Sequence, residues 1–178
     1  MKRFVLPLLL LFFGYVGVAL ADSDPAWHAT YWNNTTLSGT PVLERDEPFL
    51  YYRWNRGSPA PGVVNSDEFS ARWTRTLAFS EGTWEFTVSV DDGVRVFVDG
   101  QMIIDGWRLD EFNTLSNAIY LTEGDHEVVV EYFENSAEAV MLFSWDKILD
   151  ATVGTGAPQA PAVAGTWTGE YFLSLIHI

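Results

Sequence analysis

The sequence predicts an all-β fold, an antiparallel β-sandwich, on three observations. Apolar and polar residues alternate with a period of two along several segments, which is the pattern of half-buried strands. Turn signals recur roughly every 8–12 residues, as they do in sandwiches. No segment shows the 3.6-residue periodicity of an amphipathic helix. Because the chain has no cysteine, a packed core must stabilise this fold without disulfides.

The amino terminus is predicted to be a secretory signal peptide, residues 1–21. Two basic residues precede an apolar run from Phe4 to Leu20, and Ala19-Leu20-Ala21 supplies the small residues of a cleavage site. An uncleaved membrane anchor is the alternative, since the apolar run is nearly long enough to span a bilayer. We therefore expect a secreted or surface-exposed protein that does not insert into the membrane after cleavage.

The strictest alternation lies in the middle of the chain. Apolar residues occupy every second position from Thr83 to Val90 and again from Val94 to Val98. Asp99-Gly100 then predicts a tight hairpin turn, because glycine accepts the positive φ that such turns require. In chain order, strands are predicted over Trp27–Trp32, Pro41–Leu43, Leu50–Trp54, Phe69–Phe79, Thr83–Val90, Val94–Val98, a segment starting at Met102, Leu115–Leu121, His126–Phe133 and Ala139–Trp145.

The connections between these strands carry the polar and flexible residues. Residues 56–62 combine two prolines with two glycines and are predicted to form a surface loop. Trp107–Phe112 is expected to be irregular, Asp105-Gly106 to be a turn, and Glu134–Glu138 to be a loop.

The sandwich domain is predicted to span residues 22–149, and further segments follow it. Residues 150–165 have the small-residue and proline content of a linker. Residues 166–172 repeat the W-x-x-x-Y-aromatic spacing of Trp27–Trp32, which predicts the start of a second copy of the domain. Residues 173–178 match the translation of a sequencing-adaptor end, so we expect the natural protein to be longer.

The charge of the chain limits its partners. The formal net charge is −14 at pH 7. Nucleic-acid binding requires Lys and Arg to displace counterions, and anionic membrane surfaces attract basic segments, so both partners are disfavoured. The acidic balance is compatible with divalent cations, although a solvated acidic surface is the simpler explanation.

Trp27 through Trp145 resembles the PA14 domain family, with matching segments in the family's order. These are Asn33–Leu43, Gly57–Val63, Phe69–Thr74, Ser89–Gly100, Ile103–Trp107 and His126–Asn135. The resemblance implies a two-sheet sandwich of roughly a dozen strands. It also implies carbohydrate binding, a role that recurs among members in adhesins, glycosidases, proteases and toxins.

The resemblance further points to Asp91 and Asp92 as a metal site. In lectin-like members, two adjacent aspartates joined by a cis peptide coordinate calcium, and the ion binds sugar hydroxyls. Calcium takes about six to eight oxygen ligands, so a second loop must contribute. Asn135, in the predicted loop Glu134–Glu138, is the candidate because its amide oxygen is a neutral ligand. The alternative is that Asp91-Asp92-Gly93 is only a turn.

Aromatic residues are candidates for contact with a sugar ring. Trp107 and Trp54 could each cover the apolar face of a pyranose, although either could instead belong to the core. Catalysis has little support, because neither His28 nor His126 has an evident partner for a nucleophile-base pair. We therefore expect no enzymatic activity.

The function predicted from the sequence is a secreted, calcium-dependent carbohydrate-binding module of a larger extracellular or surface protein, such as an adhesin. Its expected partners are glycans. A structural or protein-interaction spacer without sugar binding is the alternative, and an accessory module of a glycosidase is a weaker one. The sequence determines neither the sugar nor the oligomeric state.

Overall fold

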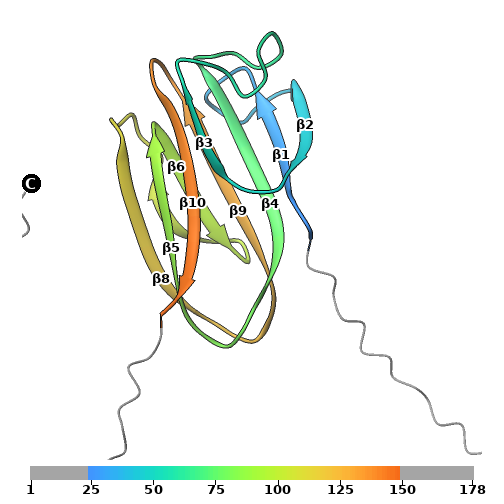
Figure 1. Cartoon of the computed structure of the whole chain (residues 1–178), viewed down its shortest axis with the longest axis vertical. Coiled ribbons are helices and arrows are strands. Elements are labelled where there is room, and N and C mark those ends of the chain that lie inside the picture. The colour runs from blue at the N-terminus through green and yellow to red at the C-terminus, as the bar shows by residue number, and fades with distance from the viewer. Residues whose placement is uncertain (1–23, 149–178) are drawn as a thin grey trace, which may run out of the picture. The chain divides into compact units, whose positions relative to one another are not determined.

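The computed structural model describes residues 24–148, and this part of the chain contains ten β-strands and no helix (Figure 1). The strands are β1 (Trp27–Trp32), β2 (Leu43–Glu47), β3 (Tyr51–Asn55), β4 (Phe69–Phe79), β5 (Gly82–Asp91), β6 (Gly93–Val98), β7 (Gln101–Gly106), β8 (Asn113–Leu121), β9 (Gly124–Glu134) and β10 (Ala139–Lys147). The predicted signal peptide, linker, second copy and adaptor-like end (1–21, 150–165, 166–172 and 173–178) lie outside the described residues.

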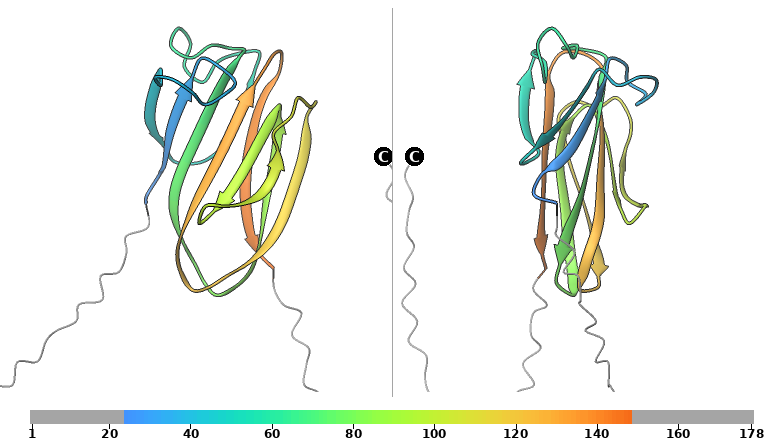
Figure 2. Two further views of the ribbon diagram at one scale, coloured as in Figure 1. Left: turned by 180° about the vertical axis from the view of Figure 1, so that it is seen from behind. Right: turned by 90° about the vertical axis from the view of Figure 1, so that its right-hand side faces the viewer.

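The strands form two sheets that face each other. The larger sheet has the order β2-β1-β4-β9-β6-β7, and the smaller has the order β3-β10-β5-β8. All strand pairs are antiparallel, and Figure 2 shows the two layers edge-on. The predicted antiparallel sandwich is therefore confirmed. The described part has ten strands, rather than the dozen or so that the family resemblance implied.

Aromatic side chains from both sheets fill the core. Trp27, Tyr31, Phe69, Trp73, Phe86 and Tyr132 are among its largest fully buried residues. Alternate residues of the central strands point inward, as the period-2 pattern predicted, so each sheet presents a continuous apolar face. Trp54 belongs to this core, because it stacks on Tyr52 with 4.9 Å between ring centroids and packs edge-on against Phe69.

Two local predictions were wrong. The second strand is Leu43–Glu47 instead of Pro41–Leu43, because pairing with β1 orders a charged segment that has no apolar alternation. Asp105-Gly106 is the end of β7 instead of a turn, and Gly106 pairs with Val94. A Cβ at position 106 would lie 2.5 Å from Leu115 Cδ1, so close packing against β8 explains this glycine. Asp99-Gly100 does form the predicted turn, with φ of 49° and 75°.

The topology brings two crossovers to one end of the sandwich. The chain passes from the smaller to the larger sheet between β5 and β6, at Asp91-Asp92. It passes back between β9 and β10, through residues 135–138. Asp91 pairs with Val140, and Gly93 pairs with Phe133, so the two crossovers are neighbours. This end, uppermost in Figure 1, is called the crossover end below.

Residues 24–148 include no helix of the length and apolarity that crossing a membrane requires.

Candidate metal centre

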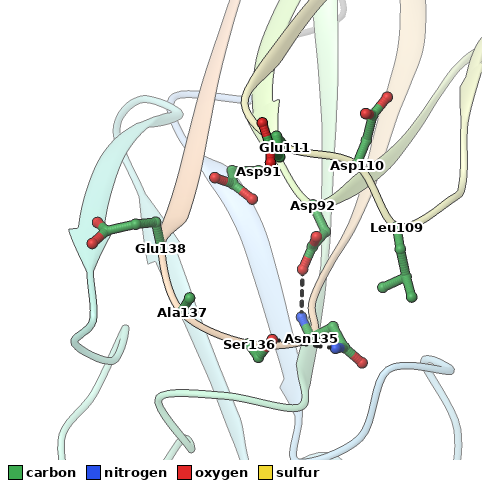
Figure 3. Close-up of a pocket in the computed structure, with 9 residues that line it drawn as sticks. All are labelled: Asp91, Asp92, Leu109, Asp110, Glu111, Asn135, Ser136, Ala137 and Glu138. Atoms are coloured by element: carbon green, nitrogen blue, oxygen red, sulfur yellow. Dashed lines mark hydrogen bonds between the residues drawn. The ribbon is translucent and has the colours of Figure 1, made fainter.

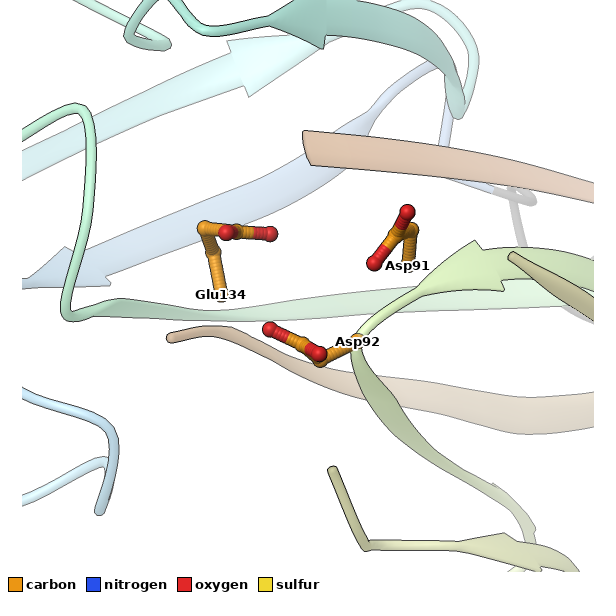
Figure 4. A group of neighbouring side chains, drawn as sticks. All are labelled: Asp91, Asp92 and Glu134. Atoms are coloured by element: carbon orange, nitrogen blue, oxygen red, sulfur yellow. The ribbon is translucent and has the colours of Figure 1, made fainter. Parts of the chain in front are cut away.

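The site begins with the backbone between β5 and β6. The peptide bond joining Asp91 to Asp92 is cis, as the family resemblance implied. Adjacent side chains of an extended strand point to opposite faces, yet both carboxylates here lie at the crossover end within reach of one another (Figure 4). The segment Asp91-Asp92-Gly93, for which a simple turn was the alternative, therefore brings two carboxylates close together.

Glu134, the last residue of β9, completes a cluster of three carboxylates. One oxygen each from Asp91, Asp92 and Glu134 lies within 4.8 Å of the other two. Two oxygens bound to one calcium ion at about 2.4 Å each can be separated by at most about 4.8 Å. The spacing therefore fits a single divalent cation, and all three ligand atoms are of the hard oxygen type that calcium prefers.

Glu134 is buried without adequate hydrogen bonding. The residue is 0% exposed, and its Oε1 atom has no hydrogen-bond partner among the described residues. Oε2 accepts a hydrogen bond of 3.1 Å from the Tyr132 hydroxyl. That hydroxyl has one hydrogen and also lies 2.5 Å from the Asp91 carbonyl oxygen. Buried polar atoms almost always have a partner, so the unpartnered Oε1 atom fits a residue that takes part in binding a cation.

The raised pKa values of two of the clustered carboxylates also favour a bound cation. Burial, and then the nearby Asp92 and Asp91 carboxylates, raise the pKa of Glu134 to about 8. Burial and the adjacent Asp92 carboxylate also raise the pKa of Asp91. Each of these groups is easier to ionise when a cation is present, because the cation offsets both the desolvation and the mutual repulsion.

The loop that follows Glu134 closes one side of the cluster. The Asn135 backbone N–H donates a 2.8 Å hydrogen bond to Asp92 Oδ2. The Asn135 side-chain amide instead donates to Ser136 Oγ at 3.4 Å, and Figure 3 shows it directed away from Asp91. From the other side, Asp67 Oδ1 accepts a 3.0 Å hydrogen bond from the Ala137 N–H. The loop predicted to join the site is thus present, and Asn135 as a side-chain ligand stays a prediction.

A pocket of about 550 Å³ opens beside the three carboxylates. Its lining comes from the β5–β6 crossover, the β9–β10 crossover and the loop between β7 and β8. The lining residues, all labelled in Figure 3, are Asp91, Asp92, Leu109, Asp110, Glu111, Asn135, Ser136, Ala137 and Glu138. A small ligand in this pocket would therefore have direct access to an ion held by Asp91 and Asp92.

Trp107 does not line this pocket. The Arg95 guanidinium lies over its ring at 4.1 Å, and Phe133 packs edge-on against it at 4.8 Å. Arg95 in turn pairs with Glu131, which also binds Arg72. Trp107 is therefore part of a network on the outer face of the larger sheet, and its role in sugar contact stays a prediction.

The two histidines among residues 24–148 have partners, but neither contacts a nucleophilic hydroxyl. His126 Nδ1 lies 2.6 Å from Asp99 Oδ2, and its Nε2 lies 3.1 Å from the Thr122 carbonyl oxygen. His28 Nδ1 lies 3.3 Å from Asp46. No hydroxyl nucleophile contacts either ring in these bonds, and His126 ties the β6–β7 turn to β9.

Sequence reasoning missed Glu134, which it assigned to a loop. The signal was present in the alternation of β9, where Val128, Val130, Tyr132 and Glu134 share the inward face. A glutamate in register with core residues, one position before the candidate Asn135, predicts a buried carboxylate beside the site.

A two-sheet antiparallel sandwich with an acidic crossover site defines this chain as a β-sandwich module with a candidate ligand pocket at one end. Comparison with known families identifies it further. Residues 23–147 match the PA14 domain, and the chain belongs to this family.

Similar proteins include regulators as well as an adhesin. The chain is 32% identical over 118 residues to Anti-sigma-I factor RsgI3 of Acetivibrio thermocellus, a match covering 65% of this chain and 18% of the relative. An anti-sigma factor domain-containing protein from Clostridium clariflavum has 28% identity and a TM-score of 0.65, covering 74% of this chain and 46% of that one. The Epithelial Adhesin 9 A domain from Candida glabrata, solved with Galb1-3GlcNAc, has the same fold at 9% identity and a TM-score of 0.54, covering 70% and 83%. The chain thus spans less than half the length of the first two.

Proposed function

We propose that this domain is a calcium-dependent carbohydrate-binding module of a secreted or surface-exposed protein. Asp91, Asp92 and Glu134 would hold the ion, with further oxygens from the 135–138 loop and, when bound, from two adjacent hydroxyls of a sugar. The ion would bind those two hydroxyls, and the pocket beside it would accommodate the sugar ring. Extracellular placement is supported by the predicted signal peptide.

One observation carries this proposal. Glu134 is fully buried, its Oε1 atom has no hydrogen-bond partner among the described residues, and its carboxylate belongs to the cluster in which one oxygen from each of three residues lies within 4.8 Å of the others. A simple turn needs no buried acidic group at this position. A calcium ion would satisfy Oε1 and offset the repulsion among the three carboxylates.

The assignment of a sugar as the ligand is supported by the pocket and by the fold. The pocket combines a strongly polar floor with an exposed apolar residue, Leu109, which can contact the C–H face of a pyranose. The adhesin domain from Candida glabrata, which was solved with a disaccharide, uses the same sandwich. No catalytic role is proposed, since both ring nitrogens of His126 are occupied by structural bonds.

The test is thermal unfolding of residues 22–178 with calcium and with chelator. A ligand at 100 times its dissociation constant stabilises a protein by about 2.7 kcal/mol, which shifts the Tm visibly. We expect this shift in the wild type and its loss in Glu134→Gln and in the double variant Asp91→Asn/Asp92→Asn. Glu123→Gln, an exposed residue at the opposite end of the sandwich, is the control and should keep the shift.

Binding of sugars is then measured by calorimetry in calcium and in chelator. Calcium-dependent heat with a simple hexose supports the proposal. If neither calcium nor any sugar binds, the crossover is a structural turn, and the domain is better described as a spacer between other modules.

A second candidate function is ligand sensing within a longer regulatory protein. The 32% identity with an anti-sigma-I factor favours it. The sequence of the intact gene tests it, because a sensor requires an anti-sigma segment on the same chain. A gene that encodes only repeated sandwich domains would contradict this second candidate.

A further inference from the structure

We propose that the acidic rim of the pocket selects sugars by charge, so that amino sugars bind more tightly than neutral sugars and uronic acids bind weakest. The acidic rim is defined as Asp110, Glu111 and Glu138. This inference rests on the proposed function, because it specifies the substrate class of the same pocket.

The acidic rim lies on two sides of the three-carboxylate cluster. Asp110 and Glu111 come from the loop between β7 and β8, and Glu138 ends the loop between β9 and β10 (Figure 3). All three line the same pocket as Asp91 and Asp92, and no Lys, Arg or His is among its lining residues. A ligand in this pocket therefore lies beside carboxylates and meets no basic side chain of the lining.

The acidic rim is only partly neutralised by neighbours. Arg108 Nη2 binds Asp110 Oδ2 at 2.9 Å. Arg56 lies 3.5 Å from Glu138, but these side chains are 81% and 50% exposed, so the pair is weak. Glu111 takes part in no ion pair among residues 24–148.

The balance of charges in the pocket is negative even with an ion bound. Three rim and three cluster carboxylates face two arginines, which leaves four negative charges. One divalent cation reduces these to two. Asp110, Glu111 and Glu138 are not among the three clustered carboxylates, so their excess charge would act on the parts of the sugar that do not coordinate.

This acidic region is more than a solvated surface patch. The cluster at its base contains Glu134, which is fully buried, has one carboxylate oxygen without a partner among the described residues, and lies with its carboxylate near those of Asp91 and Asp92 (Figure 4). Leu109, which is 65% exposed, lines the same pocket and offers an apolar contact. Together they indicate a ligand with both hydroxyl groups and an apolar face, which a sugar ring has and a simple amine or metal chelate lacks.

The expected size of the selection follows from electrostatics. A unit charge about 8 Å from another, in a medium of dielectric constant near 40–80, changes affinity roughly twofold to sixfold, and less at high salt. With two uncompensated charges in the pocket, we expect at least about a fivefold difference between the cationic and the anionic sugar at low ionic strength.

The experiment uses sugars that differ only at C6. For whichever of methyl glucoside, galactoside or mannoside binds residues 22–178 in calcium, its 6-amino-6-deoxy and uronic acid analogues are compared by calorimetry. The change at C6 leaves the adjacent ring hydroxyls available for the ion. We expect the order amino, neutral, uronate at about 20 mM salt, with the spread shrinking at about 300 mM salt because of screening.

Rim variants test where the selection arises. In Asp110→Asn/Glu111→Gln/Glu138→Gln the ratio between amino and uronate sugars should fall towards one. Glu111→Gln/Glu138→Gln should lower it part of the way and keeps the Arg108–Asp110 pair, in case the triple variant unfolds. The control Glu123→Gln/Asp125→Asn/Glu127→Gln changes net charge equally at the far end and should keep the wild-type ratio.

The outcomes distinguish failure of charge selection by the rim from failure of the proposed function. A uronate that binds as tightly as the neutral sugar, or an equal loss of selection in the control, overturns charge selection by the rim. Neutral binding without any charge order overturns this inference alone. Binding of neither calcium nor sugar overturns the proposed function, and this inference falls with it.

Discussion

Two buried glutamates show how differently the same side chain can be used in one domain. Glu47, at the end of edge strand β2, is 3% exposed, and Glu134, at the end of β9, is 0% exposed. Glu47 accepts hydrogen bonds from the Tyr31 hydroxyl at 2.8 Å and the Trp73 indole at 2.7 Å, and it pairs with Arg45 at 2.6 Å.

Glu134 has the opposite environment. Within residues 24–148 its carboxylate has one donor, the Tyr132 hydroxyl at 3.1 Å, and its other neighbours in the cluster are two aspartates. Burial alone therefore does not distinguish a structural acid from a binding acid. The distinction lies in whether the protein supplies the donors and the positive charge, or leaves them to a ligand.

The largest change in the free energy of unfolding is expected when Glu47 is replaced. Glu47→Ala leaves the Trp73 N–H and the Tyr31 O–H buried without an acceptor and removes the partner of Arg45. Breaking such a buried pair costs about 3–5 kcal/mol of unfolding free energy. Urea unfolding measures it, in calcium and in chelator alike. A loss below about 1 kcal/mol would show that water or rearrangement replaces these bonds.

Replacing Glu134 is expected to raise the free energy of unfolding, instead of lowering it, in the absence of calcium. Because its folded pKa of about 8 lies above the unfolded value of 4.5, the contribution of Glu134 to stability is complete below pH 4.5 and declines as pH rises through 8. Glu134→Gln mimics the neutral form. At pH 7.5 in chelator it should be about 2–4 kcal/mol more stable than wild type.

The pH dependence separates this effect from a general gain in packing. The advantage of Glu134→Gln should vanish near pH 4.5 and reverse in calcium, where the charged carboxylate is required. Urea unfolding at several pH values gives the difference. An advantage that is the same at every pH would contradict the raised pKa.

A smaller effect is expected at Asp67, which supports the loop after Glu134. Its carboxylate accepts the Ala137 N–H, and the Glu68 N–H donates to the Asn135 carbonyl at 3.3 Å. Residues that orient the loops of a metal site typically change metal affinity about tenfold when removed. Asp67→Ala should weaken calcium binding by that amount, as measured by calorimetry. Glu123→Ala, at an exposed position at the opposite end of the sandwich, is the control and should leave calcium affinity unchanged.

The smallest effect on stability is expected from the Asp99–His126 pair, at the far end of the sandwich. Burial lowers the pKa of His126, but the hydrogen bonds to Asp99 and to the Thr122 carbonyl outweigh it, so the net shift is upward. The contribution of the Asp99–His126 pair is therefore complete below pH 6.5 and declines as pH rises through the folded pKa. Because Asp99 is half exposed, we expect about 1 kcal/mol or less.

A comparison of wild type with Asp99→Asn tests this pair. The variant should lose stability at pH 5.5 relative to wild type and differ less at pH 8.5, by urea unfolding. Calcium affinity should not change, since the pair lies at the other end of β9 from Glu134. A calcium affinity that falls with Asp99→Asn would mean that the two ends are coupled.

Much of the fold could be predicted because its signals are local. Side-chain alternation depends only on neighbouring residues, so β4, from Phe69 to Phe79, was predicted with its observed bounds. The turn at Asp99-Gly100 was predictable for the same reason. Strand β2 was not, because its charged residues are ordered by a partner strand more than ten residues away.

The sequence by itself determined the sandwich class, the family and the aspartate pair, since these follow from short motifs and from alternation along the chain. Only the tertiary structure decided which glutamate belongs to the site. Two of the three partners of Glu47, Tyr31 and Trp73, lie 16 and 26 residues away in the sequence, and the contact between Asn135 and Asp92 spans 43. Whether a buried carboxylate meets donors or other carboxylates depends on how the two sheets are joined, and no local pattern encodes that.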